Sequence, residues 1–233
     1  PHEAMKGSPA HDYSDVRVVI FDFDGTLTTY RPMMIEAIRQ TLKLLGIERT
    51  EVELISEFKD HLHAGIRDLP SILRAMLETP TSRRSDEVWR LFVGTLMRLI
   101  EEAGPPEGVS QALGELRGRG IQLAIVSFRR RDLLRSLLSK MSWEQFFDAV
   151  ITPQDVQAFK PNQDPFLRVA TLLNVRPEEC IVVGDEPADI LGGKAAGMRT
   201  VGVLTGMLDE TLLEELGPTS IIGSVVEIGK LLD

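Results

Sequence analysis

The stretch VRVVIFDFDGTLT, residues 16–28, places two aspartates directly after a nearly continuous apolar run. The apolar run, residues 16–21, is rich in β-branched side chains, which is typical of a buried strand. Asp22 and Asp24 are separated by one residue, so their side chains point to the same side of an extended chain. Neighbouring carboxylates are unfavourable unless a cation neutralises them or one is protonated. The stretch therefore predicts a strand that ends in a chemical site, although a turn with aspartate caps would also explain it.

Other short apolar runs follow, and each precedes a helical pattern: residues 121–126, 149–151, 181–183 and 200–203. Strands that alternate with helices predict parallel strands joined by right-handed crossovers. The runs are apolar throughout rather than alternating, as expected when helices cover both faces of a sheet. The pattern therefore predicts an α/β fold with a Rossmann-like parallel sheet as its core.

Residues 31–103 interrupt this alternation with four amphipathic helical patterns and no convincing strand. The interruption ends at GPPEG, residues 104–108, a strong helix breaker. We therefore expect a flexible tail over residues 1–14, an α/β core of residues 15–30 and 104–233, and an inserted four-helix-bundle cap over residues 31–103. The insertion follows the carboxyl end of the first strand, where parallel sheets bind ligands, so it is placed to act as a lid.

Polar residues also follow the second and third strands. Ser127 ends the second strand, and its hydroxyl and the free backbone N–H groups of the next helix suit a phosphate oxygen. Arg129 would add bidentate contacts to such a phosphate. Lys160 precedes Pro161 in a loop, where its ammonium group would balance clustered carboxylates. Taken singly, these residues would equally be a helix cap and solvated surface cations.

The fourth strand repeats the arrangement of the first, with Asp185 at its end and Asp189 in the first turn of the following helix. Either aspartate alone would serve as a helix cap or as a favourable charge at the helix dipole. Because the carboxyl ends of parallel strands share one edge of the sheet, the four segments together predict one site.

Bulk composition excludes several classes of protein. The 233 residues carry a formal net charge of −9, which argues against a nucleic-acid binder. No apolar stretch is long enough to span a bilayer, so we expect no membrane insertion. The single cysteine, Cys180, lies in an apolar run and fits a reducing cytoplasm. The oligomeric state stays open.

Four segments together resemble the haloacid dehalogenase-like (HAD) phosphatase superfamily: DFDGTL at 22–27, Ser127, Lys160-Pro161, and GDEPADI at 184–190. The stretches KPNQDPFLRVATLLNV (160–175) and GDEPADILGGKAAGMRTVGV (184–203) are similar to the phosphoglycolate phosphatase-like branch, which carries a helical cap. The chain departs from that branch in three places. It has Thr28-Thr29-Tyr30 where an acidic residue is usual, Ser127-Phe128-Arg129 where Thr-Asn-Lys is frequent, and Glu186 where a small residue is usual.

The resemblance implies an Mg²⁺-dependent phosphatase of small phosphorylated metabolites. Asp22 would be the nucleophile that forms an aspartyl-phosphate, and Asp24 the general acid and base. The Asp22 carboxylate, the Asp24 backbone carbonyl and Asp185 would hold Mg²⁺, with Asp189 and Glu186 acting through water. Ser127, Lys160 and Arg129 would contact the phosphoryl group. The carboxylate of Asp24 favours phosphate esters over halogenated substrates.

The substrate stays open between phosphoglycolate-like, nucleotide and sugar phosphates. A phosphomutase on the same scaffold is the alternative activity, in which the phosphoenzyme returns its phosphoryl group to a sugar phosphate. In the cap, a solvated surface position is the first explanation of Arg67, and binding of a substrate carboxylate or a second phosphate is the alternative. His61 and His63 would titrate near neutral pH, but nothing in the sequence connects them to a ligand.

Overall fold

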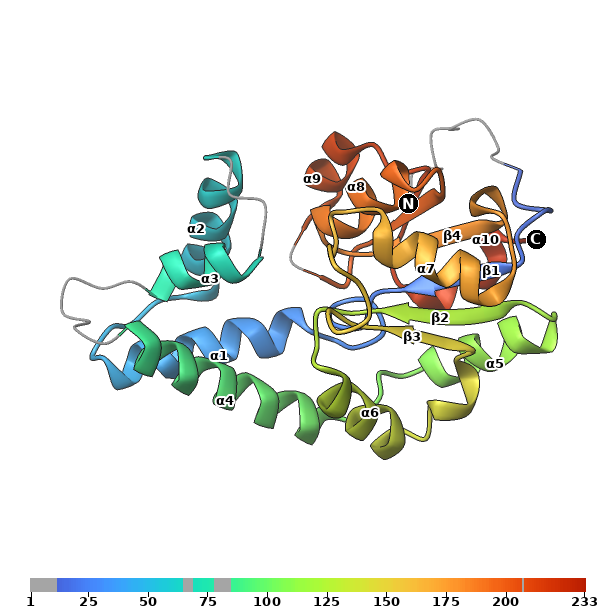
Figure 1. The fold of residues 1–233 in the computed structure, drawn as a ribbon. Coiled ribbons are helices and arrows are strands. Elements are labelled where there is room, and N and C mark those ends of the chain that lie inside the picture. Colours follow the sequence, from blue (N-terminus) through green and yellow to red (C-terminus); the bar gives the residue numbers. More distant parts are fainter. Residues whose placement is uncertain (1–11, 65–68, 78–84, 207) are drawn as a thin grey trace, which may run out of the picture.

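A six-stranded, fully parallel sheet forms the centre of the computed structural model, which describes residues 12–64, 69–77, 85–206 and 208–233 (Figure 1). The strands lie in the order β3-β2-β1-β4-β5-β6. Their bounds are β1 (Val18–Phe21), β2 (Gln122–Val126), β3 (Ala149–Ile151), β4 (Cys180–Gly184), β5 (Arg199–Val203) and β6 (Ser220–Ile222). The predicted α/β fold with a Rossmann-like parallel sheet is confirmed. Strand β6 is an addition that the sequence pattern did not reveal.

Strand β1 lies at the centre of the sheet, between β2 and β4. Phe21 pairs in register with Ile125 of β2 and with Val183 of β4, so the chain leaves all three strands at nearly the same level. The strand order reverses beside β1, because the chain moves outward through β2 and β3 and then returns to β4 on the other side. Such a reversal opens a crevice at the carboxyl ends of the strands, where doubly wound sheets bind ligands.

Helices cover both faces of the sheet, as the apolar strands predict (Figure 1). Val19 and Phe21 of β1 pack on one face with α5 (Val109–Gly118), α6 (Arg131–Lys140) and α10 (Ile228–Leu231). Val18 and Ile20 face the opposite side, where α7 (Asp164–Leu173) and α8 (Pro187–Ala195) lie. Helix α9 (Glu210–Leu216) lies between β5 and β6 in the chain. Because strand side chains alternate, both faces of β1 are desolvated and its position is strongly determined.

Residues 31–103 contain α1 (Arg31–Leu44), α2 (Glu51–His63), α3 (Leu69–Leu77) and α4 (Ser85–Ala103) among the described residues. Helices α1 and α4 lie side by side and extend away from the sheet, with α2 and α3 toward their far end (Figure 1). Met34, Phe58 and Phe92 belong to one apolar cluster of these helices. Val52, Ile55 and Phe58 recur at helical spacing, which predicts a shared apolar face of α2. Val52 is nevertheless 77% exposed, and Leu54 is buried instead.

The helices α1–α4, here called the cap helices, also contact the core. Leu208 and Leu212 belong to the same apolar cluster as the cap helices. Lys59 of α2 forms a 2.5 Å ion pair with Asp209 at the start of α9. Lys140 of α6 donates to the backbone carbonyl of Glu101 in α4 at 3.0 Å. These contacts connect both α2 and α4 to the core.

The predicted tail, residues 1–14, includes residues that the structure describes. Tyr13, which the sequence assigned to that tail, is buried, and its hydroxyl forms a 2.8 Å hydrogen bond with Ser220 of β6. Within the described residues, no helix combines the length and the apolar character that a membrane crossing requires.

Candidate active site

Buried polar side chains gather where the carboxyl ends of β1, β2 and β4 meet. Six of the predicted site residues are buried there: Asp22, Ser127, Arg129, Lys160, Asp185 and Asp189. Asp24 is close to them but keeps about a fifth of its side chain exposed, at 19%. Buried charges are costly unless they are paired, so their pairing determines the chemistry of the site.

Lys160 joins two of the aspartates. Its Nζ lies 2.6 Å from Oδ1 of Asp22 and 2.7 Å from Oδ1 of Asp189, and it also donates to the backbone carbonyl of Val126 at 3.1 Å. The Lys160 side chain is fully buried. Burial alone would lower its pKa, but the charges of Asp189 and Asp22 reverse that effect and raise the pKa above its usual value. Lys160 is therefore a fixed ammonium ion beside Asp22.

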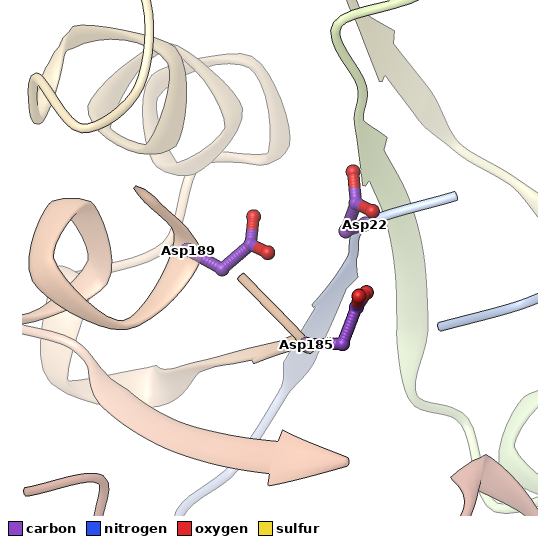
Figure 2. Close-up of side chains that lie close together, drawn as sticks. All are labelled: Asp22, Asp185 and Asp189. Carbon is purple, nitrogen blue, oxygen red and sulfur yellow. The ribbon is translucent and has the colours of Figure 1, made fainter. Parts of the chain in front are cut away.

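Three carboxylates, those of Asp22, Asp185 and Asp189, form an acidic cluster (Figure 2). One oxygen from each lies within 4.8 Å of the others. Thr26 orients Asp185 by donating its hydroxyl to Oδ1 at 2.8 Å. Gly25 has a φ of +87°, and a Cβ at that position would overlap the Asp185 carboxylate. The turn after β1 therefore requires glycine both for its backbone conformation and for the close approach of Asp185.

The acidic cluster carries more negative charge than Lys160 neutralises. Burial raises the pKa of Asp22 to about 7, with further contributions from neighbouring acids. Burial and the Asp22 charge raise the pKa of Asp185 well above its usual value, and burial does the same for Glu186. Oxygen ligands in a compact, electron-rich group suit a hard divalent cation. The donor set of the acidic cluster therefore fits a divalent metal ion.

Asp24 is paired with Arg129. The Nε of Arg129 donates to Oδ2 of Asp24 at 2.7 Å, and its Nη2 donates to Oδ1 at 2.6 Å. The remaining nitrogen, Nη1, lies 2.9 Å from the sulfur of Met97 in α4. The backbone N–H of Arg129 donates to the Ser127 hydroxyl at 3.2 Å. Phosphate binding by Ser127 and Arg129 stays a prediction, and Arg129 makes a carboxylate contact that the sequence did not suggest.

Two aromatic residues near the site were not predicted to belong to it. Tyr30, just before α1, is buried, and both its burial and the charge of Asp24 raise its pKa. Phe128 is 45% exposed, and its ring centre lies 4.9 Å from the Lys160 ammonium. The only sequence signal for either was the departure from the usual residues of the family at these positions.

Of the three cap residues that the sequence singled out, only His61 has a side chain that the structure describes. Arg67 lies outside the described residues, so its role stays a prediction. His61 is half-buried in α2, and the side chain of His63 lies outside the described part of the chain. Trp89 packs against Phe92, and the guanidinium of Arg74 lies 4.5 Å from the centre of the Trp89 ring.

Curated relatives are similar over most of the chain. A candidate pyrophosphatase, PpaX of Caldanaerobacter subterraneus subsp. tengcongensis, is 29% identical over 93% of this chain and 94% of its own length. The phosphoglycolate phosphatase of Aquifex aeolicus is 29% identical over 82% of this chain and 86% of its own. Among solved structures, a candidate β-phosphoglucomutase of Thermotoga maritima matches with a TM-score of 0.70 at 25% identity, covering 93% of this chain and 98% of its own.

The sequence model of one hydrolase family matches residues 16–197, which include every buried carboxylate of the acidic cluster together with Lys160 and Arg129. The match therefore covers strands β1 to β4 and the site at their carboxyl ends. The chain belongs to the haloacid dehalogenase-like hydrolase family.

Proposed function

We propose that this enzyme is an Mg²⁺-dependent phosphatase that hydrolyses a small organic phosphate monoester through a phosphorylated Asp22. The observation that carries the proposal is the position of Asp22, which is held by Lys160 at 2.6 Å and lies in one cluster with Asp185 and Asp189. A carboxylate nucleophile, a fixed cation and a set of metal ligands are the parts that phosphoryl transfer requires.

Asp22 provides the nucleophilic oxygen. Lys160 occupies Oδ1, whereas Oδ2 accepts no hydrogen bond from the residues that the structure describes. An Asp22 oxygen forms a bond to phosphorus while the bond from phosphorus to the leaving oxygen breaks, and Asp24 gives its proton to that leaving oxygen. Water then attacks phosphorus and loses a proton to Asp24, and the bond between Asp22 and phosphorus breaks. Lys160 and Ser127 are placed to bind the phosphoryl oxygens.

Asp22, Asp185 and Asp189 would hold the metal ion together with the backbone carbonyl of Asp24. When bound, a divalent ion neutralises negative charge on the phosphoryl oxygens. Mg²⁺ needs few protein ligands and prefers carboxylates, which supports it over softer metals.

The substrate class rests on Asp24 and on the relatives. A group that protonates the leaving oxygen is most useful when the leaving group is a poor one, as in an alkyl phosphate ester. Phosphoglycolate is a substrate of this kind, and a relative from Aquifex aeolicus is named for it. The cap helices, residues 31–103, would exclude water and contact the remainder of the substrate.

The test is a screen of phosphorylated metabolites, with inorganic pyrophosphate included, for phosphate release with Mg²⁺ and with EDTA. The screen should reveal Mg²⁺-dependent release from at least one monoester. Asp22→Asn should abolish that release, whereas Asp132→Asn, at an exposed residue paired with Arg130, should leave it unchanged. Circular dichroism checks the fold of each variant. Turnover by Asp22→Asn at the wild-type rate would overturn the nucleophile assignment, and release from pyrophosphate alone would overturn the monoester class.

A phosphomutase is the second candidate, favoured by the similarity to the candidate β-phosphoglucomutase of Thermotoga maritima. The two activities differ in what accepts the phosphoryl group from Asp22, water or a sugar phosphate. Phosphorus NMR with a hexose 1-phosphate, with and without a catalytic amount of a hexose bisphosphate, separates them. Isomerisation without release of inorganic phosphate would favour the mutase and reject the phosphatase.

A further inference from the structure

The side chain of Arg129 is committed to Asp24 on one side and to the cap helices on the other. Two of its nitrogens donate to the two oxygens of Asp24, at 2.7 and 2.6 Å. Its third nitrogen contacts the sulfur of Met97 in α4. The guanidinium also lies 5.7 Å from the centre of the Phe23 ring, and the side chain is only 6% exposed. Each nitrogen of the guanidinium therefore has a partner, and two of the three nitrogens are engaged by Asp24.

A bidentate pair of this kind fixes a carboxylate in both position and rotation. A guanidinium is planar and its donors form a rigid fork, so two parallel hydrogen bonds leave the carboxylate little freedom. Asp24 is otherwise one of the more exposed acids of the site, at 19%. Proton transfer depends on the distance between the acid and the leaving oxygen, so an acid that rotates freely is a poor one.

Resting on the proposed function, we propose that Arg129 is a positioning residue for Asp24, and that Met97 of α4 supports it from the cap side. Arg129 acts on the proton-transfer step: one Asp24 oxygen gives up its hydrogen bond from Arg129 and takes a proton from solvent, and Asp24 then donates that proton to the leaving oxygen as the bond from phosphorus to that oxygen breaks. The phosphoryl contacts of Lys160 and Ser127 belong to the proposed function and are separate from this role. Because Met97 is part of the cap helices, the orientation of Asp24 is connected to their position.

The experiment varies the leaving group. Arg129→Met keeps the length and apolar bulk of the side chain but removes the fork, and kcat/KM is measured for an alkyl phosphate and for 2,4-dinitrophenyl phosphate. The dinitrophenolate leaves without protonation, whereas an alkoxide needs it. General acid catalysis contributes roughly 10²- to 10⁴-fold, so a mispositioned acid should cost the alkyl phosphate on the order of 10- to 100-fold more than the aryl phosphate. Arg129→Lys, with one point charge in place of two donors, should give an intermediate loss.

Two comparisons separate positioning from other roles. Asp24→Asn should produce the same leaving-group dependence, and Arg129→Met added to it should cause little further loss, because residues that act as a unit are not additive. The matched control is Arg130→Met, at a residue whose side chain is 71% exposed and pairs with Asp132. It should leave both substrates unaffected. Met97→Ala should shift the leaving-group dependence in the same direction as Arg129→Met but by less.

An equal loss for both substrates in Arg129→Met would overturn the positioning role and indicate phosphate binding or a structural role. A full additional loss in the double variant would overturn it too. If Met97→Ala leaves the dependence unchanged, the link to α4 is wrong. In all of these cases the proposed function still holds if the wild-type enzyme hydrolyses both substrates and loses that activity on substitution of Asp22. An inactive wild-type enzyme would overturn both proposals.

Discussion

Replacing Lys160 with methionine tests the electrostatic balance of the whole site. The substitution preserves the apolar stem but removes the ammonium ion that lies between Asp22 and Asp189. Lys160 is 0% exposed at the side chain, and its two partners are 5% and 1% exposed, so solvent screens the charges very little. Without Lys160, two buried carboxylates lose their nearest cation.

The expected cost follows from this burial. Removing one partner of a buried ion pair typically costs about 3–5 kcal/mol, because it leaves an uncompensated charge. For a chain of about this size, each kcal/mol corresponds to roughly 2–4 °C in Tm, so the Tm should fall by about 6–20 °C. The fall should be larger at pH 8 than at pH 6, because burial raises the pKa of Asp22 to about 7 and a protonated Asp22 needs no cation.

The assay is thermal unfolding in EDTA, followed by circular dichroism or calorimetry. Lys59→Met is the matched control, since Lys59 pairs with Asp209 at a distance similar to that of the Lys160 pairs but both side chains are more than one third exposed. Exposed pairs contribute about 0–1 kcal/mol, so this variant should lose at most about 4 °C. A Tm for Lys160→Met within 2 °C of the wild type would refute the reasoning, as would a larger loss in Lys59→Met.

Three further predictions concern the effect of pH and Mg²⁺ on stability, the charge of Asp185, and the backbone at Gly25. In EDTA, stability should fall as pH rises from about 4 to 7, because the pKa of Asp22 is raised by burial from 3.8 to about 7 and the folded state binds more protons in that window. The gain in Tm on adding Mg²⁺ should therefore be larger at pH 8 than at pH 5, and an equal gain at both would contradict this. Asp185→Asn should raise the Tm in EDTA at pH 8, because burial disfavours the charged form of Asp185. The same variant should gain less Tm from added Mg²⁺. A Tm in EDTA below that of the wild type would contradict this prediction. Gly25→Ala should lower the Tm and the rate of phosphate release more than Gly46→Ala does. Gly46 has a similarly positive φ of +76°, but a Cβ there would meet no atom within 4 Å. Equal effects of the two substitutions would show that backbone conformation alone matters.

Much of the fold was predictable because its signals are local. The apolar runs and the helical periodicities located five strands and the helices on either side of them, and these predictions are confirmed. Strand β6 escaped because it has three residues, of which one is serine, and it pairs only with β5. Val52 was placed on the wrong face of α2 because periodicity alone does not define which stripe of a helix is covered.

The sequence alone singled out the side chains of the proposed site. Asp22, Asp24 and Asp185 follow strands closely, Asp189 lies in the first turn of the next helix, and Lys160 lies in a loop before Pro161. Only the tertiary structure decided their partners. Lys160 reaches Asp22 across 138 residues, and Arg129 reaches Asp24 across 105. Such pairings depend on the order of the strands in the sheet and on the burial that forces charges to pair, and neither is encoded in the spacing of nearby residues. For that reason the pairing of Arg129 with Asp24 became visible only in the structure, while phosphate binding by Arg129 stays a prediction.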